Sequence, residues 1–248
     1  MKQTLLEIQN LAVSVDDKQI LKDIDLTIEK GTLHVLMGPN GTGKSTLVSA
    51  VMGDPRYQID HGSISFEGDD ITDEAADVRA RRGIFLSFQA PEEIPGITLE
   101  NFLRTAVSAT EGKSLRILSF QKKLHKQMET LDMDESYASR YLNVGFSGGE
   151  KKKAEILQLL MLQPKFAMLD ETDSGLDVDA VKTVSEGIRA YHNPDNSILI
   201  ITHNAKILEE LDVDYVHILE DGRIVRTGGR ELADEILENG FTSLAKEA

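Results

Sequence analysis

Gly38-Pro-Asn-Gly-Thr-Gly-Lys-Ser45 is the stretch of sequence that decides the fold. It follows an apolar run, Thr32–Met37, that predicts a β-strand, and it leads into Lys44–Met52, which predicts a helix ended by Gly53. The pattern G-x-x-x-x-G-K-[ST] between a strand and a helix is typical of a phosphate-binding loop. Its glycines let successive backbone N–H groups face a phosphate, and the helix dipole adds partial positive charge there.

A second motif supplies the acidic residues that such a loop requires. Lys44 is expected to reach the β- and γ-phosphates of a nucleotide, and the Ser45 hydroxyl to bind Mg²⁺. The apolar run Phe166–Leu169 ends in Asp170, which places a carboxylate at the edge of the sheet beside the phosphates, where it can hold Mg²⁺ through water. Glu171 follows on the other face of the strand end, so we expect it to orient or deprotonate the attacking water.

The composition restricts the classes of protein and of partner. The 248 residues fit one large α/β domain. A net charge of −15 disfavours broad contact with nucleic acid or anionic lipid, and the absence of cysteine excludes disulfides and thiolate ligands. No apolar run approaches the roughly 20 residues that cross a bilayer, and Glu7 and Gln9 stand where a signal peptide needs apolar residues. We therefore expect a cytoplasmic protein.

Outward from the loop, short β-rich runs alternate with helical stretches, which predicts parallel strands joined by crossover helices. Further strands are predicted at Leu5–Gln9, Ile24–Ile28, Ser63–Glu67, Gly83–Phe88, Ile198–Thr202, Tyr215–Leu219 and Arg223–Thr227. Further helices are predicted at Gly149–Leu162, Val178–Tyr191 (with Asp177 as N-cap) and Glu231–Leu237, and hairpin turns at Asp16–Lys18 and Asp221-Gly222. The pattern is helical from about residue 91 to 145, so we assign this block to a helical subdomain inserted into a catalytic core at about 1–90 and 146–248.

Phe146-Ser-Gly-Gly-Glu150 opens one of these helices and predicts a second anion-binding site. One domain does not need two such sites for one nucleotide. Two copies packed head to tail would use both, because the Ser147–Glu150 segment of one copy would complete the γ-phosphate pocket of the other.

Taken together, these motifs resemble the ABC ATPase family, in the family's order, from about residue 5 to residue 230. The resemblance also includes Gln89, Ser174–Asp177 and His203. It implies a RecA-like mixed sheet with an antiparallel β subdomain, and Mg²⁺-dependent hydrolysis of ATP. It further implies that Gln89 reaches Mg²⁺ and water, that Asp177 aligns the two sites, and that His203 contacts the γ-phosphate.

Two features depart from the family's pattern. Phe146 and Glu150 replace the first and last residues of the usual Leu-Ser-Gly-Gly-Gln, and an acidic side chain near a triphosphate needs an offset, for which Lys151–Lys153 are the candidates. The aromatic residue that usually stacks on adenine is replaced by Val13 and Val15, so we expect a weaker apolar contact from Val15 and modest ATP affinity.

A narrower resemblance concerns the partner. Ser87–Thr98, Asn143–Lys153 and Leu169–Ala180 are similar to the SufC-type ATPases of the Suf iron–sulfur cluster assembly system. This implies a SufB–SufD-type scaffold, docked on about Gln89–Arg104, where the apolar side chains Ile94, Pro95, Ile97, Leu99 and Phe102 serve as anchors or cover the core of the helical subdomain. The alternatives are the ATPase subunit of an ABC transporter and a non-catalytic nucleotide-binding regulator.

The motifs together predict a full set of site residues and a contact in the resting state. The catalytic residues are Glu171, His203 and Gln89, and the Mg²⁺ ligands are Ser45, Gln89 and Asp170. ATP contacts are predicted for Gly38, Pro39, Asn40, Gly41, Thr42, Gly43, Lys44, Ser45, Thr46, Val15, Ser147, Gly148, Gly149, Glu150 and Asp177. We also hypothesise that Lys152 pairs with Glu171 and holds it inactive until a partner binds.

Overall fold

The computed structural model describes residues 3–113 and 115–241. The strands are β1 Thr4–Val15, β2 Lys18–Glu29, β3 Leu33–Met37, β4 Gln58–Phe66, β5 Asp69–Asp70, β6 Ile84–Ser87, β7 Ile94–Thr98, β8 Tyr141–Leu142, β9 Phe166–Asp170, β10 Ser197–Ile201, β11 Tyr215–Glu220 and β12 Arg223–Gly228. The helices are α1 Lys44–Met52, α2 Ala76–Arg82, α3 Leu99–Glu111, α4 Ile117–Thr130, α5 Gly148–Leu162, α6 Val178–Tyr191, α7 Ala205–Glu209 and α8 Arg230–Asn239, with a 3₁₀ turn, η1, at Glu135–Ser139.

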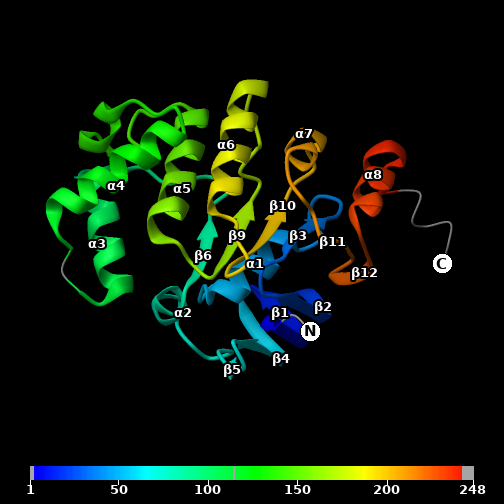
Figure 1. The fold of residues 1–248 in the computed structure, drawn as a ribbon. Coiled ribbons are helices and arrows are strands. Elements are labelled where there is room, and N and C mark those ends of the chain that lie inside the picture. The colour runs from blue at the N-terminus through cyan, green and yellow to red at the C-terminus, as the bar shows by residue number, and fades with distance from the viewer. Residues whose placement is uncertain (1–2, 114, 242–248) are drawn as a thin grey trace.

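Two larger sheets and a group of helices make up the molecule (Figure 1). The central sheet has the order β12-β11-β3-β10-β9-β6, in which β11, β3, β10, β9 and β6 run parallel and β12 pairs antiparallel. The second sheet, β2-β1-β4-β5, is antiparallel. Because β3 and β9 both flank β10 in parallel, the segments that follow them meet at one edge of the central sheet.

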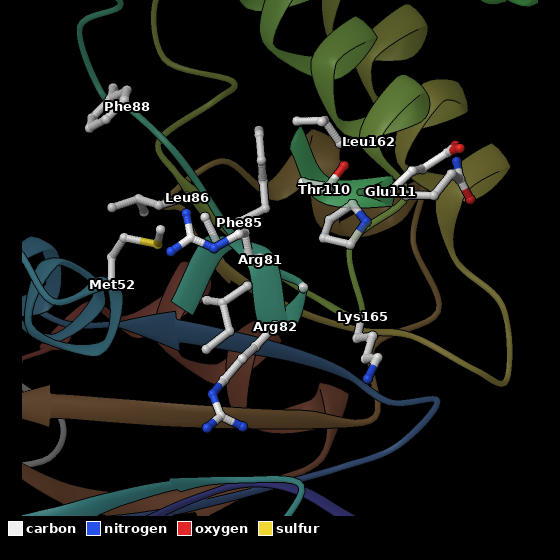
Figure 2. Close-up of a pocket in the computed structure, with 15 residues that line it drawn as sticks. Met52, Arg81, Arg82, Phe85, Leu86, Phe88, Thr110, Glu111, Leu162 and Lys165 are labelled. Carbon is white, nitrogen blue, oxygen red and sulfur yellow. The ribbon is translucent and has the colours of Figure 1, made fainter. Parts of the chain in front are cut away.

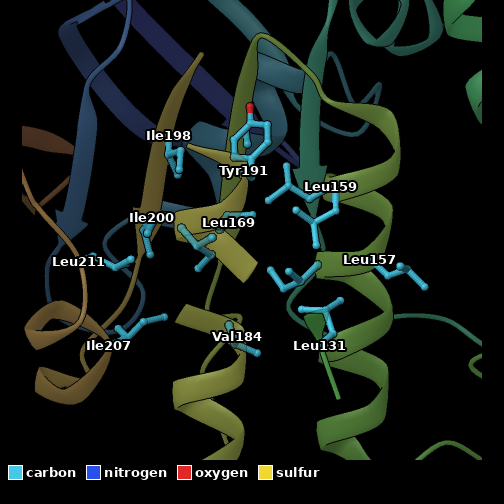
Figure 3. Close-up of a cluster of buried hydrophobic side chains, with 14 of the residues drawn as sticks. Leu131, Leu157, Leu159, Leu169, Val184, Tyr191, Ile198, Ile200, Ile207 and Leu211 are labelled. Atoms are coloured by element: carbon cyan, nitrogen blue, oxygen red, sulfur yellow. The ribbon is translucent and has the colours of Figure 1, made fainter. Parts of the chain in front are cut away.

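The apolar residues of the central strands alternate between the two faces of the sheet, as strand geometry requires. In β9, Ala167 and Leu169 face one core while Phe166 and Met168 face another. The first core lies under α5 and α6, and Figure 3 shows Leu157 and Leu159 of α5 and Val184 of α6 among its side chains. The second core is formed by the antiparallel sheet together with α1, so α1 is held between the two sheets.

The structure confirms the alternation of strands and helices and corrects several bounds. Strand β1 runs to Val15 and β4 begins at Gln58, where the sequence indicated shorter strands. The sequence analysis did not predict β5, α2 and α7, which are two to seven residues long. The block at 91–145 contains strands β7 and β8 as well as helices, because Pro95 and Gly96 favour an extended pair over a helix. In the described part of the chain, no helix is both long and apolar enough to cross a bilayer.

A buried chain of hydrogen bonds joins the two sheets near His34. The Thr32 hydroxyl donates to the carbonyl of Glu29 (2.5 Å), so its oxygen accepts from His34 Nε2 (2.9 Å). His34 Nδ1 must then accept from His217 Nε2 (2.8 Å), whose Nδ1 accepts from the Thr227 hydroxyl (3.0 Å). This assignment leaves both imidazoles neutral.

We expect this series of hydrogen bonds to make the protein less stable in acid. Burial lowers the pKa of His217 to about 4, against an ordinary value of about 6.5. The unfolded chain therefore binds more protons between these values, and the stabilisation present above pH 6.5 is lost as the pH falls to 4. Asp25, Glu29 and Tyr215 are the titratable residues that line the same cavity as His217 and His34. We expect the free energy of unfolding to fall by up to about 3 kcal/mol.

Urea unfolding at pH 7 and pH 4.5 measures this effect. The parent protein and a variant with the exposed His125→Gln substitution should both lose stability in acid, whereas His217→Gln should be less stable at pH 7 and depend less on pH. An equal pH dependence in all three proteins would contradict the assignment.

Candidate nucleotide site

The loop after β3 has the backbone that the motif requires. Gly43 has a φ of 106°, and a Cβ there would come within 2.6 Å of Leu21 Cδ2, so only glycine fits without strain. Gly43 is also the N-cap of α1, and no side chain caps this helix. The amides of the first turn of α1 are therefore available to an anion, which is the physical basis of phosphate binding at a helix N-terminus.

Lys44 is buried and holds this loop together. Its ammonium group donates to the carbonyls of Gly38 (2.7 Å) and Pro39 (2.9 Å). Burial lowers the pKa of Lys44, and the negative charges of Glu171 and Asp170 oppose that shift. The side chain is therefore a desolvated cation at the helix N-terminus, which is the position that a phosphate would neutralise.

A cavity of about 400 Å³ brings together several of the predicted residues. Its described lining consists of Ile20, Asn40, Gly41, Gly43, Lys44, Ser45, Thr46, Gln89 and Glu171. Val15 is not among these residues. It lies at the end of β1, opposite Lys18, whereas Ile20 of β2 contacts the loop beside Gly43. Ile20 is therefore an additional apolar residue beside the phosphate loop that was not predicted from the sequence, and the adenine contact of Val15 stays a prediction.

Asp170 and Glu171 differ in their surroundings, as the sequence predicted. Burial raises the pKa of Asp170, and a hydrogen bond with the Ser45 hydroxyl opposes the increase. Glu171 has a φ of 47° and is half-buried, and its Oε2 accepts a hydrogen bond from Gln89 Nε2 (2.6 Å). The strained backbone at Glu171 turns its carboxylate into the cavity beside Gln89.

The oxygen atoms at this point fit a Mg²⁺ ion. Asp170 Oδ1 is fully buried and has no hydrogen-bond partner, and the Ser45 hydroxyl and the Gln89 amide lie in the same region. Within residues 3–113 and 115–241, no three His, Asp or Glu side chains cluster as metal ligands. Mg²⁺ usually takes one or two protein oxygens and completes its shell with water and substrate phosphates, so this donor set suits it.

Comparisons with known proteins agree with this geometry. Residues 21–174 match the family model described as ABC transporter. This chain belongs to the ABC transporter family of ATPase domains. It is 48% identical to a probable ABC transporter ATP-binding protein of Streptococcus pyogenes serotype M3, covering 98% of this chain and 96% of that protein. It is 46% identical to vegetative protein 296 of Bacillus subtilis, covering 100% and 95%.

Solved structures show the ABC fold independently. MJ1267, titled an ATP-binding cassette of an ABC transporter, superposes with a TM-score of 0.78 at 25% identity over the whole of both chains. The dimeric cassette MJ0796 bound to ADP and Pi has a TM-score of 0.79 at 18% identity, over 91% of this chain and 99% of that chain. The ABC ATPase fold predicted from the sequence is therefore confirmed.

The ABC signature segment lies at the N-terminus of α5, outside the cavity lining. The Ser147 hydroxyl accepts from the amide of Glu150 (3.3 Å), and the Glu150 carboxylate accepts from the amide of Ser147 (2.6 Å), which is a complete capping box. Tyr137 also donates to Glu150, and these hydrogen bonds lower the pKa of its carboxyl. Glu150 therefore caps the helix, and its charge is offset by these donors and by Arg140.

The expectation that Lys151–Lys153 offset Glu150 is wrong. Lys151 pairs with Glu93 (2.9 Å), and Lys153 donates to the carbonyl of Asp132 (2.9 Å). Lys152 does not pair with Glu171 either, so the hypothesis of a Lys152–Glu171 contact in the resting state is wrong. Its ammonium group donates to the carbonyls of Phe88 and Gln89 and pairs with Glu155. The direction of Lys152 along α5 was predictable from the sequence, but the residue that it meets was not.

The remaining predicted residues occupy the loops after α5. Asp177 caps α6 by accepting from the amide of Ala180 (2.8 Å). His203 reaches solvent, yet partial desolvation lowers its pKa, with a further decrease from the charge of Lys44, so the neutral ring dominates at pH 7. Asp173 accepts from the Thr202 hydroxyl (2.8 Å), which ties the loop carrying Asp177 to the strand end before His203.

The predicted docking segment Gln89–Arg104 is only partly exposed. Pro95 and Ile97 are exposed, Ile94 and Phe102 are half-buried, and Leu99 is fully buried in the core. Leu99 is therefore not a docking anchor. Its burial follows from its position at the start of α3, where the apolar face of the helix meets α5.

A second, apolar groove of about 380 Å³ adjoins this segment. Phe88, 59% exposed, lies at one end, and Arg82 and Lys165 lie at the other (Figure 2). Arg82 pairs with Glu74 and Lys165 with Glu67, so the cations at this end are already neutralised. The groove therefore offers an apolar surface that ends at the exposed Phe88, next to Gln89.

Proposed function

We propose that this ABC ATPase is the motor of a Suf-type iron–sulfur cluster assembly system. Two copies pair head to tail on ATP and move a SufB–SufD-type scaffold in the cytoplasm. The observation that supports the paired state is that Asn40, Gly41 and Gly43–Thr46 line the cavity, whereas the signature segment lies outside it. A second copy supplies the amides of its own Ser147–Gly149 to the γ-phosphate.

Within each copy the residues divide the work of hydrolysis. Lys44 would exchange the Gly38 and Pro39 carbonyls for phosphate oxygens. Ser45 and Asp170 would hold Mg²⁺, which would supply neutralisation of the charge that develops on the phosphates. Glu171 orients the attacking water and accepts its proton. Glu171 Oε2 already accepts a hydrogen bond from Gln89. This bond must weaken, or the oxygen must accept a second hydrogen bond, before Glu171 activates water.

Two further residues complete the proposed site. Neutral His203 donates a hydrogen bond to the γ-phosphate, and Asp177 holds the start of α6 at the interface between copies. The isolated chain should therefore hydrolyse ATP slowly, because half of each site is missing until two copies pair.

The Suf assignment is supported by the resemblance of the residues at 87–98, 143–153 and 169–180. The scaffold is proposed to bind Phe88 and the exposed residues of β7, Pro95 and Ile97. The alternative, a transporter subunit, is favoured by the names of the relatives, such as ABC transporter ATP-binding protein.

Affinity purification of the chain from its native cells separates these functions. A Suf ATPase should retain non-membrane scaffold subunits with iron–sulfur absorbance, and Ile97→Glu should release them. Val225→Glu on β12 is a matched control, because Val225 is 51% exposed and Ile97 is 44% exposed. Capture of an integral membrane subunit instead would overturn the Suf assignment and favour the transporter.

A further inference from the structure

Helix α5 carries two charged side chains where a helix packed into a core normally carries apolar ones. Lys152 and Glu155 are 6% and 4% exposed, and their Nζ and Oε2 atoms lie 3.4 Å apart. Burial raises the pKa of Glu155 to about 7, and the charge of Lys152 opposes the increase. Desolvation of both ions is costly, and apolar residues of similar volume often stabilise such a position equally well.

Both side chains bind the backbone of Phe88, and Lys152 also binds that of Gln89. Glu155 Oε1 accepts from the amide of Phe88 (2.7 Å). Lys152 Nζ donates to the carbonyls of Phe88 (3.1 Å) and Gln89 (2.9 Å). The side chains of Phe88 and Gln89 are exposed, so their own packing does not fix this segment. Its position therefore depends on the Lys152–Glu155 pair.

The segment Phe88–Gln89 contacts the carboxylate of Glu171, the proposed general base. Gln89 Nε2 donates to Glu171 Oε2 at 2.6 Å, so a displacement of the Gln89 backbone changes this contact. At its other end, α5 begins with the signature segment at Ser147. A continuous series of contacts thus runs from Ser147 along α5, through the Lys152–Glu155 pair, to Gln89 and Glu171.

We propose that Lys152 and Glu155 are positioning residues for ATP hydrolysis, which set Gln89 on Glu171 and couple that contact to the signature segment. Engagement of Ser147 by the nucleotide of a second copy shifts α5, and the pair carries the shift to Gln89. The proposal rests on the proposed catalytic role of Glu171 and on head-to-tail pairing, but not on the identity of the partner complex.

The test removes both charges together, so that neither ion is left buried without its partner. Lys152→Met combined with Glu155→Leu keeps the volume of the core. Because small displacements of catalytic groups cost up to about 100-fold in rate, we expect kcat for ATP to fall about 10- to 100-fold. The KM for ATP and the Kd of MgATP should stay within about 2-fold, because the phosphate loop is not altered. Lys153→Met is the matched control: Lys153 lies on the same helix and also binds a backbone carbonyl, that of Asp132, and kcat should not change.

A spectroscopic measurement separates positioning from a general loss of stability. The chain has no tryptophan, so Phe88→Trp introduces a single indole into the segment Phe88–Gln89. Its fluorescence anisotropy should fall when the double substitution is added and should not change with Lys153→Met. Parental kcat and unchanged anisotropy in the double variant would overturn the proposal.

The conservative variant Glu155→Gln provides a second route if the double variant does not fold. It keeps an acceptor for the amide of Phe88 but removes the charge that faces Lys152. We expect kcat to fall below that of the parent, with the KM for ATP unchanged. Equal values of kcat in Glu155→Gln and the parent would also overturn the proposal.

Discussion

Glu171→Gln should lower ATP turnover at least 100-fold while MgATP still binds. A glutamine keeps the size of the side chain and can accept the hydrogen bond from Gln89, but it cannot take a proton from water. General-base catalysis typically contributes about 100- to 10,000-fold to a rate, which sets the expected loss. Binding should become tighter, because Glu171 is a negative charge beside the phosphate loop whose field acts on Lys44 and Asp170.

The same variant also tests whether ATP makes two copies pair. With hydrolysis blocked, ATP should hold two copies together, and light scattering after gel filtration should show twice the mass in MgATP but not in MgADP. Glu186→Gln, an exposed carboxylate on α6, is the control and should behave as the parent does. Parental turnover in Glu171→Gln would exclude Glu171 as the general base, and turnover at background level in both proteins would favour a non-catalytic nucleotide-binding regulator.

The sequence was sufficient to predict the central sheet and the phosphate loop, because both depend on local rules. The five-residue strand at 166–170 is uniformly apolar up to its final aspartate, and the glycines of the loop fix its backbone. The positions of Lys44, Ser45, Asp170 and Glu171 follow from the order of motifs along the chain. The parallel pairing of β10 with β3 and β9 then brings them to one edge.

Residues whose roles depend on contacts distant in sequence were not predicted. Lys152 lies on α5 and meets a backbone 63 residues away, and nothing in the run Lys151–Lys153 distinguishes the buried lysine from its half-buried neighbours. Glu155 gave one usable signal, a carboxylate at a helical position otherwise filled by buried residues. Ile20 was missed for a related reason, because its place in the cavity follows from the register of β1 and β2.

Lys44→Met should abolish measurable ATP binding with only a small effect on folding. Lys44 contributes charge-assisted hydrogen bonds, each worth about 1.5–3 kcal/mol, so the loss of its contacts with two phosphates corresponds to about 100-fold or more in Kd. The effect on folding is smaller, because methionine removes the donors to Gly38 and Pro39 but also the cost of burying an ammonium group.

Thermal unfolding with and without MgATP measures both effects at once. A ligand that binds only the folded state stabilises it by about 2.7 kcal/mol at 100 times its Kd, so the parent Tm should rise by several degrees. Lys44→Met should unfold near the parent temperature without nucleotide and show no increase with MgATP. The exposed Lys18→Met serves as control and should keep the full increase. If Lys44→Met kept that increase too, the amides of Gly38–Ser45 and the α1 dipole would be sufficient to bind the phosphates, and Lys44 would act only in the transition state.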